Sequence, residues 1–111
     1  MLFGSKSDKI AKAIEKKNAA GIIKYLNDKD AGVVMQAVAA LGKVQGDDSY
    51  NTLVSLLRSP KAEIRAAAVT ALTELGDPKA QAHVSHMETT EKDAVVLEAV
   101  KKALSKLHDK E

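Results

Sequence analysis

The sequence contains no cysteine, and this absence excludes several kinds of chemistry. Disulfides, thiolate metal sites and cysteine nucleophiles all require a thiol, so none of them can be present. Aromatic residues are also scarce, at 3% of 111 residues, while apolar residues reach 45%. The core must therefore be built mainly from Ala, Val, Leu and Ile, a composition that suits closely packed helices in one domain.

Long apolar runs are missing as well. No run approaches the roughly 20 residues that a membrane-spanning helix needs, so we expect no membrane insertion. Met1-Leu2-Phe3 is followed by Gly4 and a lysine-rich segment, whereas a secretory signal continues into a long apolar stretch. We therefore expect a cytoplasmic protein.

Arginine is rare, and the positive charge is unevenly placed. Arg58 and Arg65 are the two arginines, and residues 1–27 hold six lysines but only Asp8 and Glu15 as acids. The first five of these lysines form a basic patch, made of Lys6, Lys9, Lys12, Lys16 and Lys17. We favour the interpretation that this patch is the solvated outer face of a capping helix, with weak binding of nucleic acid or another anionic surface as the alternative. Nucleic acid is the less favoured partner, because arginine forks and stacking aromatics are few.

A pair of short apolar stripes, each with helical spacing, occurs three times along the chain. The copies are offset by 31 residues between the first and second, and by 30 and then 32 between the second and third. Two helices this short cannot bury their apolar faces alone, so a period near 30 predicts an all-α solenoid. The stripes are Ile22, Ile23, Leu26, Val33, Ala37, Ala40, Leu41 and Val44; then Leu53, Val54, Leu57, Ile64, Ala68, Ala71, Leu72 and Leu75; then His83, Val84, Met87, Val96, Val100, Ala103, Leu104 and Leu107.

Turn and capping residues predict where the helices begin and end. We expect Ser59 to cap a helix that starts at Pro60, and Gly76-Asp77-Pro78 to end it and open the next. Asp48 or Ser49 is the expected cap of the preceding helix, and Thr90 with Asp93 resembles a capping box. The single domain then consists of a cap helix at about 7–17 and repeats at about 18–46, 47–76 and 77–108.

Two segments carry a resemblance to a known family. They are Leu26-Asn-Asp28 through Ala40-Leu41-Gly42, and Leu57-Arg-Ser-Pro-Lys-Ala-Glu-Ile64-Arg65 through Leu75-Gly76-Asp77. Over roughly residues 18–108 the chain resembles HEAT repeats, and most closely the short bacterial and archaeal subtype that is also found in phycobilin lyases. The resemblance implies a right-handed superhelix with its second helices on the concave side, and a role in binding other macromolecules.

The resemblance also implies one polar contact between repeats. Such repeats often carry an Asp in the turn within a repeat and an Arg near the start of the second helix, and these residues form a ladder. Asp28 and Arg65 match those places, so the resemblance implies that they touch. The corresponding positions in the other repeats depart from the pattern, being Val34, Ser59, Thr90 and Leu97.

Helical projection of the second helices predicts the residues of the inner surface. The positions opposite the buried stripes are Met35, Ala39, Gly42, Ala66, Thr70, Thr73, Glu98, Lys102 and Ser105. A helix or an extended peptide of a partner could lie on this shallow surface, with Met35 as an adaptable contact. The alternative, that the small residues serve close helix packing and bind nothing, stays open.

His83 and His86 lie three residues apart, a spacing that can bring two imidazoles to one metal ion, with Glu88 and His108 as further candidates. His83 occupies the place of Ile22 and Leu53 in the earlier copies, so we favour a packing role and expect no metal site.

The sequence offers no convergent set of acids, bases or nucleophiles, so we expect neither catalysis nor a cofactor. The function predicted from these observations is a non-enzymatic scaffold or adaptor that binds a protein partner through its concave helices. Self-association through Leu97 or the arm of residues 1–3 is a second option. A lyase or chromophore chaperone, by analogy with the pigment lyases, is the remote alternative.

Overall fold

The protein is an elongated stack of helices, about 43 × 27 × 21 Å in extent. The computed structural model describes residues 4–109, and within that range it contains seven α-helices, one 3-10 helix and no strand. The elements are α1 (Lys6–Glu15), α2 (Ala19–Ile23), η1 (Lys24–Asn27), α3 (Ala31–Leu41), α4 (Asp47–Leu56), α5 (Ala62–Leu75), α6 (Ala80–Thr90) and α7 (Ala94–Asp109).

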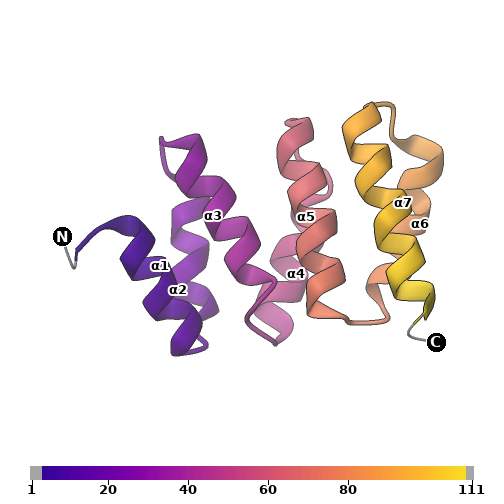
Figure 1. The fold of residues 1–111 in the computed structure, drawn as a ribbon. Helices are drawn as coiled ribbons and strands as arrows, with labels where there is room; N and C mark the ends of the chain where they lie inside the picture. Colours follow the sequence, from indigo (N-terminus) through magenta and orange to yellow (C-terminus); the bar gives the residue numbers. More distant parts are fainter. Residues whose placement is uncertain (1–3, 110–111) are drawn as a thin grey trace.

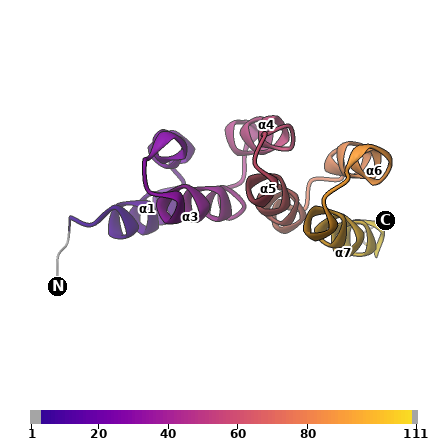
Figure 2. The same ribbon diagram turned by 90° about the horizontal axis from the view of Figure 1, so that it is seen from above.

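The helices form two rows (Figures 1 and 2). One row holds α2 with η1, then α4 and α6, and the other holds α1, α3, α5 and α7. Each of the pairs α2–α3, α4–α5 and α6–α7 is a hairpin that contacts its neighbours. The all-α solenoid predicted from the sequence is thereby confirmed.

The first helix differs from a simple cap. The sequence predicts a helix over about 7–17 that covers the first repeat, and α1 runs from Lys6 to Glu15. It lies in the row of second helices and packs against α3, as α3 packs against α5 and α5 against α7 (Figure 2). By its place in the stack, α1 is therefore equivalent to α3, α5 and α7, which are the second helices of their hairpins. Within the described residues, no first helix forms a hairpin with α1.

The core is shared between adjacent hairpins. Ile22, Leu53 and Val84 lie 31 residues apart in the first-helix row, and each is 0% exposed. Val38 and Val69 are equally buried between neighbouring second helices, although the predicted stripes do not include them. Since every interior hairpin covers its neighbour, no hairpin buries its apolar side chains alone.

Several helix starts differ from the predicted ones because the capping residues serve the turns instead. The α5 helix begins at Ala62, since the Ser59 hydroxyl accepts the Lys61 N–H and so holds the turn in front of the helix. Gly46 rather than Asp48 precedes α4, and Ser49 is buried inside that helix.

The other predicted boundaries shift by a few residues. The predicted capping box is wrong, because Thr90 ends α6 while the Asp93 carboxylate accepts the N–H groups of Val95 and Val96 at the start of α7. The α6 helix starts at Ala80 instead of Pro78.

Candidate functional site

The exposed side of the row α3, α5 and α7 carries most of the residues predicted for a binding surface. Eight of the nine predicted positions are exposed or half-buried. We call this set the second-helix face, and it consists of Met35, Ala39, Ala66, Thr70, Thr73, Glu98, Lys102 and Ser105.

Gly42 is the exception, and its predicted place on the inner surface is wrong. The residue is buried where α3 meets α5, and a Cβ atom added to it would lie 2.9 Å from the backbone oxygen of Ala71. Glycine is required here because the two helices approach too closely for any side chain. At Gly42 the helices α3 and α5 therefore pack directly against each other, and the second-helix face has no groove between them there.

A groove of about 470 Å³ opens between α5 and α7. Three predicted residues line it, Thr70 and Thr73 from α5 and Lys102 from α7. Ala99 and Ala103 add apolar surface on the α7 side. The groove thus combines small apolar side chains with hydroxyl and ammonium groups, which is the mixture that peptide-binding grooves present.

The polar groups of this groove determine its hydrogen-bonding capacity and its charge. The Thr73 hydroxyl donates to the Val69 carbonyl oxygen at 2.8 Å, so its oxygen keeps a free lone pair that can accept a hydrogen bond. Glu74, the carboxylate in the lining, lies 3.0 Å from the ammonium group of Lys43. Lys106 joins Lys102 one helical turn further along α7, a neighbour that the i, i+4 spacing could have revealed in the sequence. The groove therefore carries a net positive charge.

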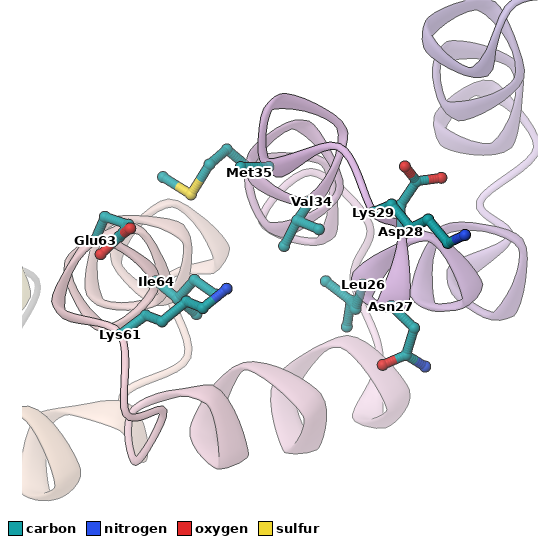
Figure 3. A pocket seen from close by; sticks show the side chains of 10 residues that line it. Leu26, Asn27, Asp28, Lys29, Val34, Met35, Lys61, Glu63 and Ile64 are labelled. Atoms are coloured by element: carbon teal, nitrogen blue, oxygen red, sulfur yellow. The ribbon is translucent and has the colours of Figure 1, made fainter.

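A second, smaller groove lies at the edge where the turns within the hairpins are found (Figure 3). Its volume is about 170 Å³, and Leu26, Val34 and Ile64 form its apolar part. Met35 and Lys61 lie at its border and belong to opposite sides of it (Figure 3). Because Met35 is also part of the second-helix face, this groove extends that face toward the turns.

Arg65 forms the strongest polar contact between two hairpins, but with a residue other than the predicted one. Its Nε and Nη2 atoms donate to the two carboxylate oxygens of Glu91 at 2.9 and 2.8 Å. Its Nη1 atom donates to the Ser59 carbonyl oxygen at 2.9 Å. Bidentate pairs of this kind are among the stronger ion pairs in proteins, and this one joins the start of α5 to the turn before α7.

The Glu91 carboxylate is 6% exposed and is held by further hydrogen bonds. The hydrogen bond from Arg65 is the main reason that the pKa of Glu91 is lowered, and the backbone N–H of Asp93 contributes to the shift. The same hydrogen bond raises the pKa of Arg65. Glu91 does not stand out in the repeat pattern, because the turn position aligns with the preceding residue, Thr90.

Asp28 pairs with the first helix instead of with Arg65. The Lys6 ammonium group lies 2.7 Å from the Asp28 carboxylate. This hydrogen bond lowers the pKa of Asp28 and raises that of Lys6. The implied contact between Asp28 and Arg65 is therefore replaced by two ion pairs, Lys6 with Asp28 and Arg65 with Glu91. In both pairs the cation contacts an acid in the turn of the following hairpin.

The structure divides the predicted basic patch. Lys6 is neutralised by Asp28, and Lys17 lines a different groove, together with Asp47 and Asp48. The remaining three lysines, with Lys24 from η1 as a fourth, surround a groove between α1 and α2. Lys24 is one of the six lysines of residues 1–27, but it lies outside the predicted basic patch. The four side chains are Lys9, Lys12, Lys16 and Lys24.

His83 does not occupy the apolar slot predicted for it. The true offset in this helix is 31 residues, so Val84 takes the slot and is fully buried, while His83 is exposed. Its ring packs in an edge-to-face arrangement with that of Tyr50, with centroids 6.4 Å apart. Within the described residues, no cluster of three or more His, Asp or Glu side chains could hold a metal ion. The side chain of His108 lies outside those that the structure describes.

Among curated proteins no match was found. None of the helices between residues 4 and 109 has the length and apolarity that crossing a membrane demands. The family model of HEAT repeats matches residues 19–105, which is most of the chain. Members of this family generally act as protein-interaction scaffolds and are generally not catalytic. The chain belongs to the HEAT-repeat family.

Proposed function

We propose that this protein is a non-enzymatic scaffold or adaptor that holds a protein partner against the second-helix face. The observation that carries the proposal is the groove between α5 and α7, because three residues chosen from helical spacing alone line it. The general role of the family supports the same reading.

The form of the surface favours a peptide segment over a small molecule. The groove is open along its length instead of enclosed, and Ala99 and Ala103 leave room for the side chains of a helix or an extended strand. Lys102 and Lys106 give it a cationic border. A partner segment that carries a carboxylate next to small apolar side chains would fill it best.

Site-directed photo-cross-linking tests the proposal. A photoreactive amino acid is placed at Thr70 in the groove and, as a matched control, at Asn51, which is exposed on α4 in the other row. The purified chain is then exposed to the proteins of its source cells and irradiated. We expect an adduct of defined mass from Thr70 and none from Asn51.

Substitution provides the second part of the test. The double variant Met35→Glu with Thr70→Glu alters two residues of the second-helix face and leaves the buried core unchanged. We expect it to lose the partner identified by cross-linking while keeping its helical circular dichroism. Equal cross-linking at both positions, or retention of the partner by the double variant, would reject the proposed face.

A further inference from the structure

The groove between α1 and α2 lies at the place where one more first helix would pack. Its lining residues on the α2 side include Asn18, Gly21 and Tyr25. Residues 31 positions later, on α4, and 62 positions later, on α6, lie at the same places in their hairpins. The surroundings of these α2 residues can therefore be compared with those of the equivalent residues on α4 and α6.

In the later hairpins the first of these positions is buried. Ser49 and Ala80, which correspond to Asn18, are both 0% exposed. His83, which corresponds to Gly21, reaches back to the ring of Tyr50 on α4. On α2 the position that corresponds to Ser49 and Ala80 is open, since Asn18 is exposed.

The α1 side of the groove supplies a row of positive charge. Lys9 and Lys12 on α1 and Lys16 directly after its end are spaced by three and four residues, so they follow one stripe over about 10 Å. Lys24 completes the border from the other side, and its ammonium group lies 5.4 Å from the centre of the Tyr25 ring. The lining holds no carboxylate. Among the residues that the structure describes, none of these four lysines forms an ion pair.

The floor of the groove is apolar and narrow. Ala13 is buried at its base, and the Tyr25 ring forms one wall. The volume of about 200 Å³ suits a few inserted side chains. An apolar floor between two helices with like charge on both borders complements an amphipathic helix whose apolar stripe is flanked by carboxylates.

We propose that the groove between α1 and α2 binds an acidic amphipathic helix of another protein, which takes the place of a first helix in front of α2. The site is separate from the second-helix face, so it does not depend on the function proposed above. Nucleic acid fits the lining less well, because arginine is missing there and the face of its one aromatic ring is already approached by Lys24.

A second copy of the chain fits less well than an acidic helix. Stacking the last hairpin of one copy on the first helix of another would bring α7 toward α1. Lys101 stands on α7 at the position of the buried Val38 and Val69, and it is exposed. Its charge would face the lysines of α1, which disfavours that arrangement.

The test uses a fluorescent helical peptide of about five turns, with leucines at i, i+3 and i+7 and glutamates on both flanks of that stripe. The control peptide has glutamine in place of every glutamate. Binding is followed by fluorescence anisotropy at physiological salt, and the amide signals of Ala13 and Gly21 are followed by NMR. We expect the acidic peptide to bind and to shift these two signals, and the glutamine peptide to bind at least about tenfold more weakly.

Two pairs of charge reversals locate the site. Lys12→Glu with Lys16→Glu should weaken binding of the acidic peptide by at least about tenfold. Lys92→Glu with Lys101→Glu changes the net charge equally at the far end of the stack and should leave binding unchanged. The variant Met35→Glu with Thr70→Glu should also bind normally, which separates this site from the second-helix face.

Three results would overturn the proposal. They are failure of the acidic peptide to bind the parent chain, equal loss in both pairs of charge reversals, and tighter binding of a short DNA duplex than of the peptide.

Discussion

Replacing Gly42 by alanine should destabilise the protein, although the same exchange in most helices does the opposite. Gly42 has an ordinary right-handed conformation, with φ of −66° and ψ of −13°. Alanine adopts this conformation easily, and the loss of chain freedom in the unfolded state alone would favour it by about 0.4–1 kcal/mol. The sign of the effect is therefore decided by what the new methyl group meets.

The new methyl group would meet backbone. It would lie 2.9 Å from the Ala71 oxygen and 3.0 Å from the Ala71 Cα atom. Neither atom can rotate away, so α3 and α5 have to separate along their contact. Such overpacking typically costs about 1–3 kcal/mol. Set against the entropic gain, the expected net loss is about 0.5–2 kcal/mol, or a melting temperature lowered by roughly 2–8 °C.

Gly32 provides the matched control on the same helix. It is exposed near the start of α3, and an added Cβ atom would approach only the Asp30 carboxylate, at 3.1 Å. That carboxylate oxygen accepts the Gly32 N–H at 2.8 Å as the cap of α3, and a shift of a few tenths of an ångström keeps this hydrogen bond. Gly32→Ala should therefore leave the free energy of unfolding within about 0.5 kcal/mol of that of the parent chain. Thermal and urea unfolding followed by circular dichroism measure both variants. A Gly42→Ala protein as stable as the parent chain, or more stable, would refute the close contact between α3 and α5.

Three further changes test other parts of the stack. Glu91 has a pKa below its ordinary value, so its ion pair with Arg65 contributes its full stabilisation above the ordinary glutamate pKa. This contribution is lost as the pH falls through the lowered pKa. Glu91→Gln should therefore flatten the acid limb of a plot of melting temperature against pH, and an unchanged limb would contradict this role. The Ser49 hydroxyl is buried without a hydrogen-bond partner, so Ser49→Ala should stabilise the protein by about 1 kcal/mol in urea unfolding, whereas a loss would show that the hydroxyl has a bonding partner. Leu72 is 0% exposed and Val95 is 70% exposed, so truncation to alanine should cost about 2–5 kcal/mol at Leu72 and less than about 0.5 kcal/mol at Val95; similar costs at both would contradict the shared core.

The repeated hairpin could be predicted from the sequence because burial follows the helical period. Leu41, Leu72 and Leu53 were assigned to buried stripes by spacing alone, and all three are fully buried. The same reasoning placed Gly42 on the surface, because a single stripe describes burial against one neighbour. A second helix in this stack touches its own hairpin partner and the second helices on both sides, so its buried arc is wider than one stripe.

Polar contacts were harder to predict than the apolar core. An apolar position repeats with the helix, whereas the partner of a charged side chain depends on where a turn places one atom. Arg65 could have met any acid near the neighbouring turns, and it meets Glu91 instead of Asp28. Similarly, a one-residue error in the repeat offset was enough to exchange His83 with Val84. Caps shifted for the same reason, since the Ser59 hydroxyl serves the turn and not the helix.

The two ends of the stack solve the same problem in different ways. An interior hairpin has apolar side chains on both sides, and a terminal one must avoid exposing them to water. On α7 this is achieved by substitution, since Lys101 stands where Val38 and Val69 are buried in the preceding second helices. On α1 and α2 the apolar floor remains, with Ala13 and Tyr25 inside a border of lysines. Because Lys101 puts a charge where another helix would pack and the floor of Ala13 and Tyr25 stays apolar, the groove between α1 and α2 is the one that we propose receives a helix.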